Sequence, residues 1–264
     1  MQPRKDSEKS SAARTAAVRR TRPVPRLDPA RLAAFRRGLL GWYRRHGRDL
    51  PWRRTRDPYA ILVSEVMLQQ TQVRRVLDYY PRFLTRYPTV EALAAAAEAS
   101  VREAWEGLGY YRRASNLRAA ARAIAVHHGG RFPETPAELE ALPGIGRYTA
   151  AALASFAFGA DAAILDTNAA RVLARVFGAG RSRGRTARLW AVARRATPAG
   201  KAYAFNQGIM DLGALICTAR RPACSDCPVR KACRFFGDGA RPAPRPRPAT
   251  RPRRDRAAER RALR

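Results

Sequence analysis

Hydrophobic residues recur every three or four positions along most of the chain between residues 28 and 217. This spacing matches the turn of an α-helix, and the alternating pattern of β-strands and Asn-Gly hairpins is absent. Leu32, Phe35 and Leu39, for example, would share one helical face behind an N-terminal cap at Asp28. We expect helices over residues 28–46, 59–70, 73–87, 89–97, 100–107, 114–127, 136–142, 147–158, 168–177, 186–195 and 203–217. The pattern therefore predicts an all-α protein.

The two ends of the chain lack this period. Residues 1–26 are rich in Arg, Ser, Ala and Pro, and residues 237–264 repeat Arg and Pro. Such segments cannot bury enough apolar surface to fold alone, so we predict two disordered basic tails. The first tail has no apolar stretch typical of a secretory signal, and no apolar run is long enough for a membrane span. We expect a cytoplasmic protein with no membrane partner.

The charge balance indicates a polyanionic partner. The chain has 52 Lys and Arg residues against 21 Asp and Glu residues, a formal net charge of +31. Release of counterions favours the binding of such a chain to nucleic acid. The composition therefore makes a nucleic-acid-binding protein the first hypothesis.

All four cysteines lie close together, in the order C-x6-C-x2-C-x5-C, as Cys217, Cys224, Cys227 and Cys233. Thiolates that converge on one point bind soft metal centres. Disulfides are disfavoured because no secretory signal precedes the run. Zinc sites with four cysteines usually pair two C-x2-C hooks, and only one hook is present here. The spacing favours an iron–sulfur cluster and leaves zinc as the alternative.

A glycine-containing turn separates two predicted helices at residues 142–150, L-P-G-I-G-R-Y-T-A. Its glycines allow a tight bend, and the free N–H groups of the following helix can bind a phosphate. An ordinary corner between helices is an equally good interpretation of the turn alone. The segment 164–168, I-L-D-T-N, follows the turn. Asp166 in this segment is either a simple N-cap or an acid that faces the DNA groove to which the turn would bind.

Taken in order, the hairpin, the L-D-T-N segment and the cysteine run resemble the helix-hairpin-helix DNA glycosylases of the endonuclease III superfamily, over about residues 30–235. The resemblance implies two helical domains with a DNA-binding cleft between them. One, the cluster domain, would comprise residues 27–53 and 164–236, and the other, a six-helix domain with the hairpin, residues 54–163. It also implies one [4Fe-4S] cluster on the four cysteines and a monomer that binds double-stranded DNA. Leu142, Gly144, Gly146 and Arg147 would contact the DNA backbone.

Two further segments narrow the chemistry. Bifunctional members carry a nucleophilic lysine where this chain has Tyr148, so base removal without strand cleavage is expected. Residues 64–73, S-E-V-M-L-Q-Q-T-Q-V, resemble the segment that carries the catalytic glutamate of MutY-type adenine glycosylases, and residues 107–113 resemble the wedge region of that family. Glu65 would then be catalytic, and Gln69, Gln70 and Tyr110 would contact the unpaired base or fill its place. Read without the resemblance, Glu65 is an ordinary helix acid and Tyr110 a packing residue.

The chemistry needs two carboxyl groups in different protonation states. Glu65, beside apolar neighbours, would keep a proton and donate it to the leaving adenine. Asp166 would be ionised and stabilise the cationic sugar, while Asn168 and Tyr148 would position these groups. The expected substrate is adenine paired with 8-oxoguanine or guanine.

Two alternatives stay open. Residues 51–59, P-W-R-R-T-R-D-P-Y, also suit the branch that removes thymine or uracil from T·G and U·G pairs. Most adenine-glycosylase relatives continue into a Nudix-like domain that recognises 8-oxoguanine, and we expect the basic tail in its place. A non-catalytic DNA-binding protein would be expected to have lost one of the two acids. The cluster is expected to order the loop from Cys217 to Cys233 and to bring Arg220, Arg221 and Arg230 toward phosphates.

Overall fold

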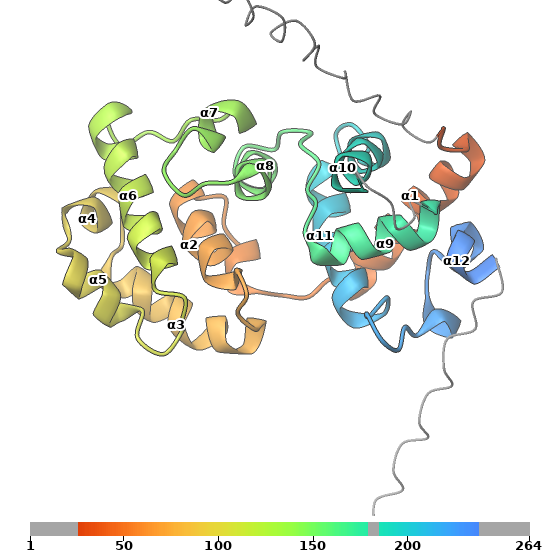
Figure 1. Cartoon of the computed structure of the whole chain (residues 1–264), viewed down its shortest axis with the longest axis horizontal. Helices are drawn as coiled ribbons and strands as arrows, with labels where there is room; N and C mark the ends of the chain where they lie inside the picture. Colours follow the sequence, from red (N-terminus) through yellow and green to blue (C-terminus); the bar gives the residue numbers. More distant parts are fainter. Residues whose placement is uncertain (1–25, 179–184, 238–264) are drawn as a thin grey trace, which may run out of the picture.

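The computed structural model describes residues 26–178 and 185–237 (Figure 1), and these contain helices and turns but no strand. The predicted all-α class is confirmed. The predicted tails fall outside the described residues, apart from Arg26 and Gly237. The α-helices are α1 (Pro29–His46), α2 (Pro58–Leu68), α3 (Val73–Arg86), α4 (Val90–Ala95), α5 (Glu98–Ala104), α6 (Arg112–His127), α7 (Pro136–Glu140), α8 (Arg147–Phe156), α9 (Thr167–Phe177), α10 (Arg185–Ala196), α11 (Ala202–Leu215) and α12 (Arg234–Gly237).

The helix ends follow from local chemistry. The carboxylate of Asp28 accepts a hydrogen bond from the first turn of α1, as predicted, and Asp57 does the same at α2. Each of the predicted helices is present, with ends that differ by up to three residues. The structure adds α12 and three short 3₁₀ helices, η1 (Pro51–Arg53), η2 (Cys224–Asp226) and η3 (Arg230–Ala232). These elements are too short to produce a periodic pattern.

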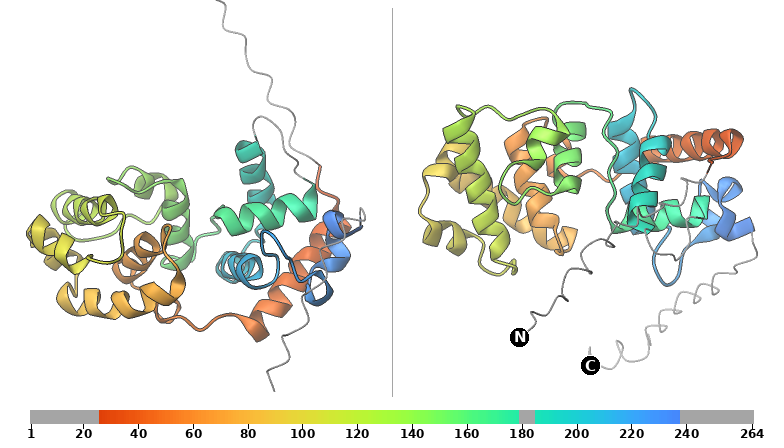
Figure 2. Two further views of the ribbon diagram at one scale, coloured as in Figure 1. Left: turned by 60° about the horizontal axis from the view of Figure 1, so that its bottom comes forward. Right: turned by 45° about the horizontal axis from the view of Figure 1, so that its top comes forward.

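The helices pack around two hydrophobic cores. One core is built between residues 50 and 164, around large side chains such as Phe83 and Trp105. The other combines α1 with residues 163–232 and contains Phe35 and Phe205. Figures 1 and 2 show two groups of helices, α2 to α8 and α1 with α9 to α12. We propose that these two cores belong to the two domains expected from the sequence.

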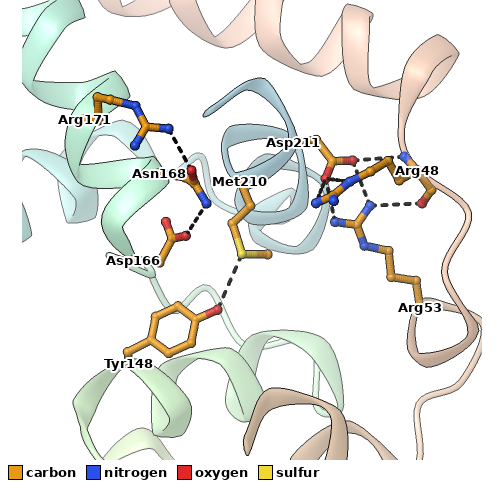
Figure 3. A network of polar contacts seen from close by, with 8 residues as sticks. All are labelled: Arg48, Arg53, Tyr148, Asp166, Asn168, Arg171, Met210 and Asp211. Carbon is orange, nitrogen blue, oxygen red and sulfur yellow. Dashed lines mark hydrogen bonds and ion pairs between the residues drawn. The ribbon is translucent and has the colours of Figure 1, made fainter. Parts of the chain in front are cut away.

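A buried ion pair holds the segment between α1 and α2 against α11. The carboxylate of Asp211 is fully buried and accepts hydrogen bonds from the guanidinium groups of Arg48 and Arg53 at 2.7–2.9 Å (Figure 3). Nearby, the guanidinium of Arg56 stacks at 4.0 Å on the ring of Tyr203, also in α11. These contacts place α11 beside the segment that leads into α2. No helix of the described residues is both long and apolar enough to cross a membrane.

Candidate active site

A cleft of about 840 Å³ lies between the two cores. It is lined by α2 and the turn that follows, by the start of α8, by the chain leading into α9, and by α11. Seven of the residues predicted to be functional line it, namely Glu65, Gln69, Gln70, Gly146, Tyr148, Asp166 and Asn168. The fold thus brings together segments that are about 100 residues apart in the sequence.

Glu65 is the one charged residue of α2, and most of the other residues of this helix are apolar. Residues 59–67 of α2 are all buried, so Glu65 is carried into the protein interior and only 5% of it is exposed. This burial raises the pKa of the Glu65 carboxyl to about 7, and the negative charge of Asp166 acts in the same direction. A hydrogen bond from Tyr148 and the charge of Arg53 oppose the rise. Glu65 can therefore hold a proton near neutral pH.

Asp166 is held rigidly at the N-terminus of α9. Its Oδ1 accepts a hydrogen bond from the backbone N–H of Ala169 at 2.6 Å, and its Oδ2 accepts one from Asn168 Nδ2 at 2.9 Å. Asn168 Oδ1 in turn accepts from Arg171 at 2.7 Å (Figure 3). Asp166 is thus an N-cap and also a wall of the cleft, and the two interpretations of the sequence are compatible.

Tyr148 lies between the two acids at the start of α8. Its hydroxyl lies 3.5 Å from the sulfur of Met210 and within hydrogen-bonding reach of the carboxyl of Glu65, and it can donate its one proton to either. Burial and the nearby charges of Glu65 and Asp166 raise the pKa of Tyr148 well above its usual value. Tyr148 therefore stays neutral and can act as a hydrogen-bond donor.

The residues expected to read the partner base lie on turns. Gln69 lines the cleft, and its amide lies 3.5 Å from the hydroxyl of Thr149. Gln70 is exposed, with a backbone φ of +57°. Tyr110 is 59% exposed, with a φ of +50°, and is not among the residues that line the cleft. Tyr110 is therefore not buried between helices, as the alternative interpretation would require.

The hairpin between α7 and α8 contains both buried and exposed residues. Leu142 is buried, with 6% of its surface exposed. Gly144 has a φ of +72°, and a Cβ there would lie 2.5 Å from the side chain of Asn116, so glycine is required. Arg147 is exposed, and its guanidinium stacks at 4.1 Å on the ring of Trp190 in α10. Neither these three hairpin residues nor Tyr110 line the cleft itself.

The four cysteines line one small cavity at the far end of α9 and α11, and none forms a disulfide. Arg175 donates to Cys217 Sγ at 3.2 Å, and burial raises the pKa of the Cys227 thiol to about 12. Among the described residues, no three His, Cys, Asp or Glu side chains are grouped so that they could hold a single metal ion. The four thiols line this one cavity, which is the arrangement that a metal centre shared by the cysteine run requires.

The sequence did not reveal several residues that shape this site. Arg53 and Met210 line the cleft, and Asp211 lies behind it. Arg53 lies in the motif at residues 51–59, but its partner Asp211 is 158 positions away. Only the folded structure shows that pairing.

These features define a helical protein with a two-acid cleft, and comparisons with known proteins agree. Residues 63–194 match the model of the HhH-GPD superfamily of base excision DNA repair proteins. The chain belongs to this superfamily.

Individual relatives are named for two different bases. The chain is 45% identical over 219 residues to the adenine DNA glycosylase of Homo sapiens, covering 78% of this chain but only 40% of the relative. It is 42% identical over 219 residues to the thymine-DNA glycosylase of Aeropyrum pernix, covering 80% of this chain and 98% of the relative. A solved structure of a thermostable thymine-DNA glycosylase superposes with a TM-score of 0.75 at 34% identity, covering 79% of this chain and 98% of that one. The predicted fold is confirmed.

Proposed function

We propose that this protein is a monofunctional DNA glycosylase of base excision repair that removes adenine paired with 8-oxoguanine or guanine. The observation that carries the proposal is the buried Glu65, with a pKa of about 7, in one cleft with the hydrogen-bonded Asp166. The adenine DNA glycosylase of Homo sapiens at 45% identity supports adenine as the base. Mismatched double-stranded DNA would be the partner, bound by a monomer at the bacterial nucleoid in the cytoplasm.

The two acids would divide the work. Protonated Glu65 donates its proton to a ring nitrogen of the flipped adenine, and the electrons of the N-glycosidic bond leave with the base. The sugar becomes an oxocarbenium-like cation, which the carboxylate of Asp166 stabilises. A water molecule then adds to the sugar carbon and gives its proton to a carboxylate. The products are free adenine and an abasic site.

Strand cleavage is not expected in this mechanism. It would require an amine that forms a Schiff base with the sugar. Tyr148 stands where bifunctional relatives carry that lysine, and its phenol cannot form one. The two lysines among the described residues, Lys201 and Lys231, do not line the cleft. The abasic product would therefore persist until alkali is added.

We further propose that Cys217, Cys224, Cys227 and Cys233 hold one [4Fe-4S] cluster. The cavity that they share and the guanidinium of Arg175 beside Cys217 support this, because a cation offsets the charge of a thiolate-bound cluster. A bound cluster would cross-link the loop between α11 and α12, which carries the exposed Arg220, Arg221 and Arg230.

The colour of the purified protein tests the cluster. An iron–sulfur protein is brown with broad visible absorbance and contains about four iron atoms per chain, whereas a zinc protein is colourless. A colourless protein with one zinc would contradict the assignment. A cluster-free preparation that bound DNA normally would contradict the role in ordering the loop.

A thymine or uracil glycosylase acting on T·G and U·G pairs is the second candidate. The relative from Aeropyrum pernix is matched over 98% of its length, and it is named a thymine-DNA glycosylase. The chain spans 40% of the human adenine relative, so the match to that protein leaves much of its length uncovered.

Single-turnover base release tests both candidates. Duplexes with A·8-oxoguanine, A·G, T·G and U·G pairs are incubated with the protein and split with or without alkali. Release from the A-containing duplexes, seen as a break only after alkali, is the expected result. Release from T·G or U·G alone would establish the second candidate.

Substitutions then test the two acids. Glu65→Gln and Asp166→Asn should each slow base release by about a thousandfold, because a catalytic acid or base contributes 10²–10⁴-fold. DNA binding should stay within about threefold of wild type. Asp28→Asn is the matched control, since it changes an N-cap aspartate of α1 outside the cleft. Unchanged turnover of Asp166→Asn would overturn the mechanism.

A further inference from the structure

Arg113, in the first turn of α6, is a buried arginine that contacts two separate turns. Only 8% of it is exposed. Its Nη1 donates to the carbonyl oxygens of Val66 at 2.9 Å and Met67 at 2.7 Å, and to that of Gln69. These carbonyls belong to the last turn of α2, the helix that carries Glu65, and to the residue that follows it. A guanidinium there supplies donors to carbonyl oxygens at the end of the helix, and its charge is favourable at a helix C-terminus.

The other terminal nitrogen of Arg113 reaches further along both turns. Nη2 donates to Thr71 Oγ1 at 3.0 Å, beyond the end of α2. It also donates to the carbonyl oxygens of Gly109 at 3.0 Å and Leu108 at 3.4 Å, in the turn before α6. One side chain thus joins the turn at residues 69–71 to the turn at residues 107–110.

These turns hold the two non-glycine residues of the described chain that have a positive φ, Gln70 at +57° and Tyr110 at +50°. The left-handed region is unfavourable for residues with a Cβ, and such conformations persist where the surroundings enforce them. The guanidinium of Arg113 lies 5.5 Å from the ring of Tyr110 and 5.4 Å from that of Trp105. Arg113 is therefore placed to enforce both.

The charge of Arg113 is engaged with backbone oxygens and rings. Among the residues that the structure describes, no carboxylate forms an ion pair with it. Burial lowers the pKa of the Arg113 guanidinium, although arginine keeps its charge in proteins. A planar fork of donors fits this set of acceptors, whereas the single ammonium of lysine does not.

We propose that Arg113 is a positioning residue for mismatch recognition. It fixes the turn with Gln69 and Gln70 relative to the turn with Tyr110, so that both contact the mispair together. This inference rests on the proposed function in one respect, that DNA with an unpaired or flipped base lies against these two turns.

The test compares Arg113→Lys with Arg118→Lys. Arg118 lies on the same helix and donates to the carbonyl oxygen of Ala96 at 2.6 Å, away from both turns. The affinities of each variant for a mispaired and a fully paired duplex are measured with a target nucleotide that carries 2′-fluorine, which resists cleavage. For Arg113→Lys the ratio of the two affinities should fall about tenfold, the size of effect expected when hydrogen bonds to a charged group are lost. For Arg118→Lys it should stay within about twofold.

Hydrogen exchange of the free protein provides a readout independent of DNA. In Arg113→Lys the peptides that contain residues 69–71 and 107–110 should exchange faster together, while those of α7 and α8 exchange as in wild type. Uniformly faster exchange, or an unchanged affinity ratio, would overturn the proposal by showing a purely structural role.

A milder variant covers the case in which Arg113→Lys does not fold. Thr71→Val removes one acceptor of Arg113 while keeping the shape of the side chain. It should lower the affinity ratio by about threefold, and an unchanged ratio would count against the proposal.

The outcome is separable from that of the proposed function. If the wild-type protein releases thymine or uracil and not adenine, the same measurements are made on a T·G duplex. If it releases no base, the affinity ratio and the exchange data still decide the role of Arg113. A wild-type protein that does not prefer any mispair would overturn the proposal directly.

Discussion

Glu65 lines the cleft between the two cores and Asp211 lies behind it. The pKa values of these two buried carboxyl groups shift in opposite directions. Glu65 and Asp211 are both buried, with 5% and 0% of the residue exposed. Burial raises the pKa of Glu65 to about 7. Burial also acts on Asp211, but hydrogen bonds from Arg53 and the charges of Arg53 and Arg48 lower its pKa below the usual value. One group holds a proton near neutral pH and the other a negative charge.

The difference shows that partners and not burial decide the charge of a buried acid. Asp211 receives hydrogen bonds from both arginines and from the backbone N–H of Arg48. Within the described part of the chain, the hydroxyl of Tyr148 is the one hydrogen-bond partner that favours the charged form of Glu65. Arg53 is near both acids, yet its guanidinium is committed to Asp211. Glu65 is thereby left as a proton donor.

Removing the charge of Asp211 should produce the largest loss of stability. Asp211→Asn leaves Arg48 and the buried Arg53 without their shared carboxylate, and breaking a buried pair in this way costs about 3–5 kcal/mol. Urea unfolding at pH 7 measures the change. The control is Asp49→Asn, which breaks an exposed pair with Arg54 whose charges are screened by solvent, and its effect should be much smaller. Equal effects of the two substitutions would contradict the contrast.

Replacement of Glu65, unlike that of Asp211, should stabilise the protein relative to wild type as the pH rises. Its folded-state pKa of about 7 exceeds the ordinary value of 4.5, so the folded protein binds this proton more tightly than the unfolded chain does. The contribution of Glu65 to the stability of the wild type therefore falls as the pH rises from about 4.5 to about 7 and is constant above that range. Glu65→Gln removes this contribution while it slows base release by about a thousandfold.

Unfolding free energies at two pH values test this expectation. The difference in unfolding free energy between Glu65→Gln and wild type should shift in favour of the variant by about 3 kcal/mol from a pH below 4.5 to pH 8. Asp211→Asn should show no such gain with rising pH. A difference between Glu65→Gln and wild type that does not change with pH would mean that Glu65 titrates normally.

The smallest effect concerns the hydroxyl of Tyr148. Base release by the wild type should slow as the pH rises through about 7, because Glu65 loses the proton that it must donate. Tyr148→Phe removes a hydrogen bond that lowers the pKa of Glu65, so this decline should move to higher pH by up to about one unit.

The pH dependence of single-turnover base release between pH 5 and 9 provides the measurement. Tyr59→Phe is the control, because the hydroxyl of Tyr59 is also buried on α2 but donates to the carbonyl oxygen of Tyr87 instead. A decline that stays in place, or moves to lower pH, in Tyr148→Phe would show that Glu65 is not the proton donor.

Much of the fold could be predicted because its signals are local. The helical period depends on residues three and four positions apart, and caps such as Asp28 and Asp166 act within one turn. The cysteines are close in sequence, so a shared site was also predictable. The short helices η1, η2, η3 and α12 were missed because each has only three or four residues, too few for the helical period to repeat.

The sequence predicted which residues belong to the candidate site but not which contacts their side chains make. The sequence by itself determined an all-helical chain, a cluster of cysteines, and motifs that contain Glu65 and Asp166. Only the tertiary structure decided that Asp211 claims Arg53 from 158 positions away, that Arg147 stacks on Trp190, and that Arg113 joins two turns. The charge of a buried group depends on which side chains packing brings within a few ångströms, and that information is not local in the sequence.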